Sequence, residues 1–385
     1  MLGNFTFHNP TKLYFGENAL EHLSQELGKY GEKVMLVYGG GFIRKNGIYD
    51  AVQAELRKAG KQTVELSGVM PNPTIEKVME GVALARKEAV DFILAVGGGS
   101  VCDYGKAVAG SAYCEQDPWE YYFNNFGEMT CRWIPVGCVL TMAGTGSEMD
   151  SCSVISKHSE NRKKFYYFRN PDFSILNPIY TYTVPKHHTV AGIYDIMSHI
   201  LEQYLSGTDD NTTDYIAEGL MRSLVVSSRK VLGNPDDYEA RSNIMWTATW
   251  ALNGLLACGK PTDWMGHMLG QAYTDATHGH TLSAVSGAYY RLLIGRSEEA
   301  VKKFRRLAEN VWGISSDGKT EKDIAVEGLL RMEEWMRDMG LAMNITACGA
   351  DASQLEGMAD ACPINESGYV VLTREDVIEV LRQSL

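Results

Sequence analysis

The sequence predicts an α/β domain with a Rossmann-like parallel sheet, followed by an all-α domain. In the first half, short apolar runs that end in glycine, such as residues 33–41 and 90–100, alternate with helix-like segments. Beyond Pro185 these runs nearly vanish, and long amphipathic helical periods replace them. Alternating β and α units form parallel sheets that helices cover on both faces. We therefore expect residues 1–182 to form the α/β domain and residues 183–385 to form the helical domain.

The elements of the first domain are bounded by glycine and proline. The strands are expected at residues 33–41, 61–68, 90–100 and 132–141, and the helices at residues 46–60 and 72–89. Pro73 stands at the start of the second helix, where a missing N–H costs nothing. Residues 90–100 form a near-continuous apolar run, as expected of a parallel strand that is buried on both faces.

The second half consists of helical periods. They are expected at residues 190–205, 211–231, 237–258, 263–275, 297–312, 321–339 and 373–383. The last helix has a clear start signal, because Thr373 can cap its N-terminus and Asp376 follows three residues later. No internal repeat or low-complexity tract interrupts the pattern.

Composition narrows the class of protein. The chain has 385 residues, of which 45% are hydrophobic and 22% charged, and its net charge is −12. An acidic chain is a poor match for nucleic acid, whose phosphates require a basic surface. No apolar run approaches 18 residues, so no membrane span is expected. The N-terminus lacks the pattern of a signal peptide, and eight scattered cysteines form no CxxC pair. These features favour a cytoplasmic location with reduced thiols.

The strongest motif is GGGSVCDYGK, residues 97–106, at the end of an expected strand. Consecutive glycines let the backbone approach a phosphate closely, and a helix that starts near Val101 would point its N–H groups at the anion. A tight β–α turn also needs glycine, but not three in a row followed by Ser100. The motif therefore favours a phosphate group, as in a dinucleotide.

Two further turns follow strands of the same domain. TMAGTGSE, residues 141–148, offers small hydroxyl and glycine residues for a pyrophosphate or nicotinamide pocket, although such residues are common in loops. YGGGFIRKNG starts at Tyr38 and lacks the acid that often binds a ribose 2′-hydroxyl. Arg44 and Lys45 follow instead. They favour a 2′-phosphate, hence NADP(H) over NAD(H), with exposed basic loop residues as the alternative.

Histidine and aspartate gather in the helical half. In DIMSHILE, residues 195–202, Asp195, His199 and Glu202 share the face opposite an apolar stripe. Taken alone, this pattern is typical of a solvated polar face, since i,i+4 polar pairs are common on helices. His267 and the THGH segment that holds His278 and His280 follow, and His187 and His188 precede the helix. Several segments with Asp or His also fit a metal site between the two domains.

Together these motifs resemble one family. The segments GGGSVCDYGK, TMAGTGSE, ILNP, TVAGIYDIMSHILEQY and THG occur in the order and spacing of the iron-activated (group III) alcohol dehydrogenases. The chain most resembles their NADPH-dependent butanol dehydrogenase and aldehyde reductase branch, over nearly its whole length and least after about residue 300. The resemblance implies a dehydroquinate synthase-like architecture, in which residues 1–182 bind the dinucleotide and residues 183–385 bind a metal.

The resemblance also implies an activity and a site. It implies hydride transfer between NADP(H) and a small alcohol or aldehyde such as butanol or butanal, with one divalent metal, Fe²⁺ or Zn²⁺, in a homodimer. The metal-binding and catalytic residues are implied by motif match to be Asp195, His199, His267 and His278. The implied cofactor-binding residues are Gly39, Gly40, Gly41, Gly97, Gly98, Gly99, Ser100, Asp103, Thr141, Thr145 and Ser147. Lys106 also matches the family motif, as a residue with a structural role.

Three features depart from the family pattern. Phe42 replaces a small polar residue after the first glycine run, and Gln271 replaces a second histidine near the nicotinamide. His278 follows His267 by 11 residues, a shorter gap than in the family, so His280 is the alternative ligand. The competing functions are a polyol (glycerol-type) dehydrogenase, a dehydroquinate synthase-like lyase, and a degenerate nucleotide-binding homologue with little activity.

Overall fold

The computed structural model describes residues 2–160, 162–208, 210–271 and 276–385. The chain divides into two compact units. One comprises His8–Val184, and the other comprises Pro185–Leu385 together with the N-terminal segment up to Phe7. None of the helices in the described ranges is both long enough and apolar enough to cross a membrane.

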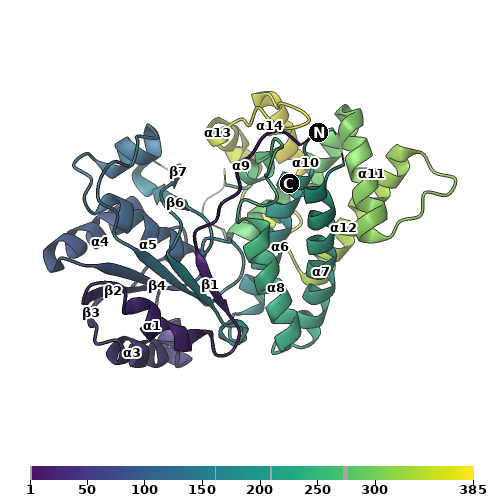
Figure 1. Ribbon diagram of the computed structural model, residues 1–385. Coiled ribbons are helices and arrows are strands. Elements are labelled where there is room, and N and C mark those ends of the chain that lie inside the picture. Colours follow the sequence, from purple (N-terminus) through teal and green to yellow (C-terminus); the bar gives the residue numbers. More distant parts are fainter. Residues whose placement is uncertain (1, 161, 209, 272–275) are drawn as a thin grey trace. The chain divides into compact units, whose positions relative to one another are not determined.

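The first unit is built on a parallel sheet of six strands (Figure 1). Its strands are β1 (Lys12–Phe15), β2 (Lys33–Tyr38), β3 (Gln62–Leu66), β4 (Phe92–Gly97), β5 (Val136–Leu140) and β8 (Phe173–Leu176), in the spatial order β1-β8-β5-β4-β2-β3. The expected strands in the ranges 33–41, 61–68, 90–100 and 132–141 are β2 to β5. The expected α/β class with a parallel sheet is therefore confirmed.

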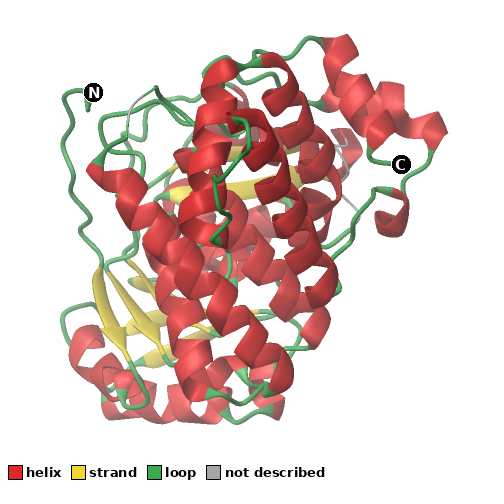
Figure 2. Cartoon of the chain, turned by 90° about the vertical axis from the view of Figure 1, so that its right-hand side faces the viewer, coloured by secondary structure: helices red, strands yellow, loops and turns green. Residues whose placement is uncertain are grey.

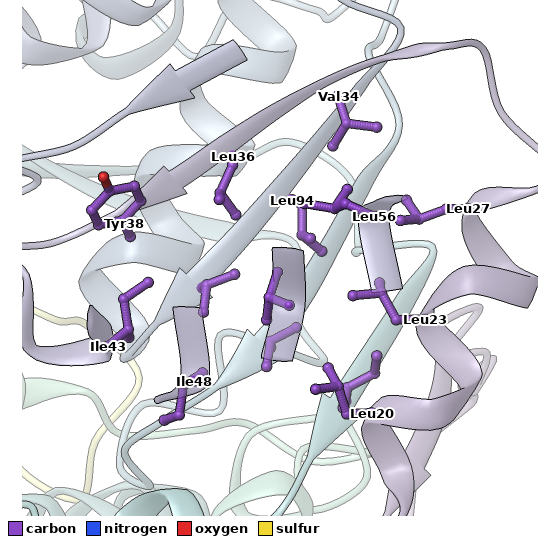
Figure 3. Close-up of a cluster of buried hydrophobic side chains, with 14 of the residues drawn as sticks. Leu20, Leu23, Leu27, Val34, Leu36, Tyr38, Ile43, Ile48, Leu56 and Leu94 are labelled. Atoms are coloured by element: carbon purple, nitrogen blue, oxygen red, sulfur yellow. The ribbon is translucent and has the colours of Figure 1, made fainter. Parts of the chain in front are cut away.

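Helices cover both faces of this sheet (Figure 1). They are α1 (Leu23–Leu27), α2 (Phe42–Lys45), α3 (Ile48–Lys58), α4 (Ile75–Glu88) and α5 (Gly99–Ser111). Alternate residues of a strand point to opposite faces, so both faces of central β4 are apolar and all six of its residues are buried. On one face, Leu36 and Leu94 pack with side chains of α1 and α3 in the cluster of Figure 3. On the other face, Gly105 lets α5 approach Ala95 closely.

Two local expectations in this unit need correction. Pro73 does not open the helix expected at residues 72–89, because α4 begins at Ile75 and Thr74 is its N-cap. The Thr74 hydroxyl accepts a hydrogen bond from the Lys77 amide at 3.3 Å. An antiparallel hairpin of β6 (Cys152–Lys157) and β7 (Arg162–Tyr167) forms a separate sheet that was not expected. Its strands are short and rich in polar residues, so their periodicity is weak.

The second unit is helical (Figures 1 and 2), and its described residues contain no strand. Its helices are α6 (Lys186–Tyr204), α7 (Thr212–Gly233), α8 (Tyr238–Ala251), α9 (Met265–Gln271), α10 (His278–Arg296), α11 (Glu298–Trp312), α12 (Glu321–Met339), α13 (Leu355–Ala361) and α14 (Arg374–Gln383). The expected capping start of the last helix is confirmed, since Thr373 and Asp376 form a capping box. Similar boxes open α7 and α12.

The helices α10 and α13 were missed, and α8 is shorter than the helix expected there. Most residues of α10 are buried, including every residue from 279 to 286, so this half of the helix has no polar face from which a period could be read. The helix expected at residues 237–258 ends at Ala251, and the one expected at residues 263–275 is α9. Residues 272–275 of that expectation lie outside the described residues.

Candidate metal centre and nucleotide-binding edge

Helix α6 carries the Asp195 and His199 pair, and it is buried on every side. Each residue from Val190 to Tyr204 is buried, and the exposed fractions of Asp195 and His199 are only 4% and 5%. The alternative of a solvated polar face is therefore wrong. Burying a carboxylate costs free energy unless a partner or a metal ion balances its charge, so the polar side of α6 requires an explanation.

Asp195 lies at the centre of a group of histidines. Its Oδ1 atom is 3.7 Å from Nε2 of His199, 3.6 Å from Nε2 of His267 and 3.6 Å from Nε2 of His278. Helix α6 supplies Asp195 and His199, α9 supplies His267, and His278 is the first residue of α10. The structure thus brings together all four residues that the family resemblance implies as ligands, and all four belong to the helical unit.

The polar atoms of this group are available for a ligand. In the described part of the chain, Asp195 Oδ1, His199 Nδ1 and His267 Nε2 are buried and have no hydrogen-bond partner. Potential ligand atoms of these three residues lie within 4.8 Å of one another. One carboxylate and several imidazoles form a donor set that suits Fe²⁺ or Zn²⁺. The residues present therefore fit a divalent metal.

The charges of the group are strongly coupled. Burial favours the neutral form of Asp195, but the imidazoles of His199, His267 and His278 outweigh it and hold the pKa of this carboxyl well below its usual range. Burial lowers the pKa of His199 to about 4. Burial also opposes the charge on His267, but the carboxylates of Glu202 and Asp195 raise its pKa to about 9. Asp195 is therefore ionised at neutral pH, as a metal ligand must be.

The other histidines of this region are used differently. His280 makes hydrogen bonds to the backbone with both ring nitrogens: Nδ1 accepts from the Ala342 amide at 3.2 Å, and Nε2 lies 3.2 Å from the His187 carbonyl oxygen. Its ring stacks on that of His187. The side chain of Gln271 contacts Met268 on its own helix, with Nε2 2.9 Å from the sulfur.

The glycine-rich turns of the first unit meet at one edge of its sheet. Tyr38, the last residue of β2, pairs with Val96 of β4, and Gly97 at the end of β4 pairs with Leu140 of β5. The three turns that follow these strands therefore lie beside one another. The strand order reverses between β2 and β4, since β3 lies on one side and β5 on the other. Such a switch point at the carboxyl edge is where open α/β sheets bind nucleotides.

The backbone of these turns can receive a phosphate. A Cβ atom at Gly40 would meet no described atom within 4 Å, and Gly41 has a φ of +96°, a conformation that favours glycine. Gly99 lets the Thr145 side chain approach the backbone of the turn, because a Cβ at Gly99 would collide with it. Helix α5 begins at Gly99, two residues earlier than expected, so Ser100 lies in its first turn.

The remaining implied cofactor residues hold the turns in place. Asp103 accepts hydrogen bonds from the Ser147 hydroxyl at 2.5 Å and from the Val154 amide at 3.1 Å. The fully buried Lys106 forms an ion pair with Asp150 at 2.7 Å and donates to the Ser147 carbonyl at 2.9 Å. These contacts fasten the turn at residues 141–148 to α5. Thr141, at the start of that turn, is also buried.

An acid that the sequence analysis did not find lies beside the first glycine turn. Glu65 of β3 forms an ion pair with Arg44 at 2.6 Å, and the Arg44 guanidinium also donates to the Tyr38 hydroxyl at 2.6 Å. The strand that precedes the turn carries no such acid at its end, but the neighbouring strand supplies one. Only the pairing of β2 with β3 reveals this, because Arg44 and Glu65 are 21 residues apart in the chain.

The fold and these two regions together define a class of protein, a metal-dependent oxidoreductase that uses a nicotinamide nucleotide. Two family models match the chain: "Iron-containing alcohol dehydrogenase" over residues 10–178, and the C-terminal domain of the Fe-containing alcohol dehydrogenase family over residues 189–385.

Individual relatives agree with these matches. A probable NADH-dependent butanol dehydrogenase of Bacillus subtilis is 38% identical, over 99% of this chain and 100% of the relative. The NADPH-dependent aldehyde reductase YqhD of Escherichia coli is 35% identical, over 93% and 92%. The crystal structure of NADH-dependent butanol dehydrogenase A from Thermotoga maritima superposes with a TM-score of 0.93 at 34% identity, over 100% of this chain and 99% of that one. The chain therefore belongs to the iron-containing alcohol dehydrogenase family, and it is an alcohol dehydrogenase or aldehyde reductase.

Proposed function

We propose that this enzyme interconverts small primary alcohols and aldehydes, such as butanol and butanal, with a divalent metal held by Asp195, His199, His267 and His278. One observation carries the assignment of the site: potential ligand atoms of Asp195, His199 and His267 lie within 4.8 Å of one another, and Asp195 Oδ1 and His267 Nε2 are buried without a hydrogen-bond partner among the described residues. The names of the relatives, butanol dehydrogenase and aldehyde reductase, support the choice of substrate. A bound divalent metal would supply a Lewis acid for the alcohol or aldehyde oxygen.

We also propose a division of labour between the two units. The turns after β2, β4 and β5 hold the nucleotide, with the Gly97–Ser100 segment at its pyrophosphate and the N-terminus of α5 directed at the anion. Asp103 and Lys106 keep the turn at residues 141–148 in position for the nicotinamide, with Thr141, Thr145 and Ser147 on that turn. The helical unit holds the metal, with Asp195 and His199 buried and the side chains of His267 and His278 partly exposed.

For the nucleotide we propose NADP(H) in preference to NAD(H). Arg44 and Lys45 offer positive charge for a 2′-phosphate. Glu65 neutralises part of that charge. Its carboxylate is also able to accept a hydrogen bond from a ribose 2′-hydroxyl, which would favour NAD(H). Relatives of both kinds exist, named NADH-dependent and NADPH-dependent. Comparing kcat/KM for the two cofactors tests the proposal, and a clear preference for NADH would overturn it.

We further propose that the chain forms a homodimer and acts in the cytoplasm. The family resemblance supports the dimer, and light scattering on the purified protein tests it. All eight cysteines lie in the described part of the chain and are unpaired, which fits a reducing compartment.

The central test combines metal analysis with turnover. The purified enzyme should contain about one divalent metal per chain and oxidise NADPH when butanal is added, and a chelator should abolish the activity. A panel with glycerol and propane-1,3-diol separates this function from that of a polyol dehydrogenase. A protein that binds nucleotide but neither metal nor aldehyde would be a degenerate homologue, and the proposal would then be wrong.

A further inference from the structure

Glu202 lies next to the metal ligands, and the proposed function leaves it without a role. It is on α6, and its exposed fraction is 2%. One carboxylate oxygen, Oε2, lies 2.9 Å from Nδ1 of His267. The other, Oε1, accepts a hydrogen bond from the Ser198 hydroxyl at 3.1 Å. The carboxylate is therefore held from two sides, and one of them is a ring of the proposed metal site.

The chain around Glu202 is arranged to keep this contact. The Glu202 carbonyl accepts a hydrogen bond from the Asp263 amide at 2.8 Å, which ties α6 to the segment that leads into α9. Gly266 immediately precedes His267, and a Cβ atom there would collide with Oε1 of Glu202. A glycine at this position leaves room for the carboxylate directly beside the ring.

From this geometry we propose that Glu202 is a positioning residue that orients His267 toward the metal. A neutral imidazole has one N–H donor and one acceptor nitrogen, and a carboxylate can only accept. In the neutral ring that binds a metal, the contact with Glu202 therefore places the proton on Nδ1 and leaves the lone pair on Nε2. That nitrogen has no hydrogen-bond partner among the described residues and faces Asp195. Carboxylate–histidine–metal arrangements of this kind fix the ring and increase its basicity.

The charge of Glu202 supports the same role. In the described part of the chain, the ion pairs of Glu202 and Asp195 are with histidines only. With neutral imidazoles, the two buried carboxylates match the charge of one divalent cation. Another buried glutamate of this unit, Glu218, has a cationic partner, because it forms an ion pair with Arg306 at 2.5 Å. Glu202 has no such partner from a lysine or arginine among the described residues.

The experiment measures metal affinity directly, with Co²⁺ added to metal-free protein in competition with a chelator. We expect Glu202→Ala to raise the Co²⁺ dissociation constant by about 10- to 100-fold, and Glu202→Gln by a smaller factor, because the amide oxygen can still accept from Nδ1 but carries no charge. The visible absorption of bound Co²⁺ should also change, since the orientation of one ligand is lost. Glu218→Gln is the matched control and should bind Co²⁺ like the wild type.

This inference rests on the proposed metal site, and a fourth variant separates the two. If Asp195→Asn binds Co²⁺ like the wild type, the proposed site itself is wrong. If Asp195→Asn loses Co²⁺ but folded Glu202→Gln keeps both the affinity and the absorption spectrum of the wild type, the role of Glu202 is wrong. Glu202→Gln preserves shape and volume, so it decides the question even if Glu202→Ala does not fold. Circular dichroism of the metal-free proteins establishes which variants are folded.

Discussion

Two buried aspartates of the helical unit have opposite surroundings. Asp214 on α7 is fully buried, and each of its carboxylate oxygens lies 2.7 Å from a lysine ammonium, Lys260 on one side and Lys303 on the other. Asp195 on α6 is almost as buried, but its neighbours at 3.6–3.7 Å are imidazoles, and its Oδ1 has no hydrogen-bond partner among the described residues. One carboxylate is neutralised by the chain, and the other is not.

This difference separates a structural ion pair from the proposed metal site. The two lysine ammonium groups already balance the charge of Asp214, so this aspartate contributes to the stability of the folded state. A neutral imidazole has a nitrogen lone pair that can bind a metal ion. A group of imidazoles around one carboxylate can therefore bind a cation. Burial alone therefore does not indicate function. The identity of the neighbours does, and the following variants test that conclusion.

The largest effect on activity is expected at Asp195 and its neighbouring histidines. Asp195→Asn and His199→Ala should each lower the turnover of butanal by about three orders of magnitude or more, because the Lewis acid would be lost. Metal content should fall with the activity, while the circular dichroism spectrum should stay close to that of the wild type. Wild-type turnover in His199→Ala would refute the site.

Replacing Asp214 should lower the stability of the protein but leave its activity unchanged. Asp214→Asn leaves Lys260 and Lys303 buried without their shared counter-charge, which should cost about 3–5 kcal/mol of stability. Urea unfolding measures this loss. The folded fraction should bind one metal per chain and turn over butanal like the wild type. Loss of metal from folded Asp214→Asn would mean that the two carboxylates do not differ in the way described.

Two histidines of α10 repeat the comparison on a smaller scale. The ring of His278 lies beside Asp195, whereas both ring nitrogens of His280 face backbone groups. His278→Ala should therefore lose the metal, and His280→Ala should keep it while losing about 1–3 kcal/mol of stability. Mass spectrometry of the metal content checks both variants. Metal loss in the His280 variant alone would show that His280 is the ligand.

The smallest effect concerns a carboxylate whose partners are exposed. Glu26 in the first unit is buried and pairs with Lys12 and Lys29, whose side chains are more than half exposed. Burial opposes ionisation, but these partners and Tyr14 lower the pKa of Glu26 to about 2. Because its folded pKa is below the ordinary 4.5, its contribution is present above about pH 4.5 and is lost as the pH falls toward 2.

Replacing Glu26 tests this pH dependence. Glu26→Gln should cost about 1 kcal/mol at pH 6, since solvent screens the lysine partners, and the difference from the wild type should shrink at pH 3. Urea unfolding at the two pH values measures it. An equal difference at both would show that the carboxylate acts through packing rather than charge.

Local signals allowed part of the fold to be predicted. The glycine runs at the ends of β2 and β4 and the capping box at Thr373 depend on a few adjacent residues, so they are visible in the sequence. Helix α10 was missed because most of its residues are buried, and burial of its N-terminal half on all sides removes there the polar face that marks a helix. The hairpin of β6 and β7 was missed because its strands carry little apolar periodicity.

The same division applies to the site. By itself, the sequence determined the order of α/β and helical segments, the glycine turns and the Asp195–His199 spacing, since each depends on residues close together in the chain. Only the tertiary structure decided that this pair is buried, that Glu202 contacts His267, and that Glu65 pairs with Arg44. These contacts join residues between 21 and 65 positions apart. Such distant residues meet only when separate strands or helices pack, so no local pattern can encode their contact.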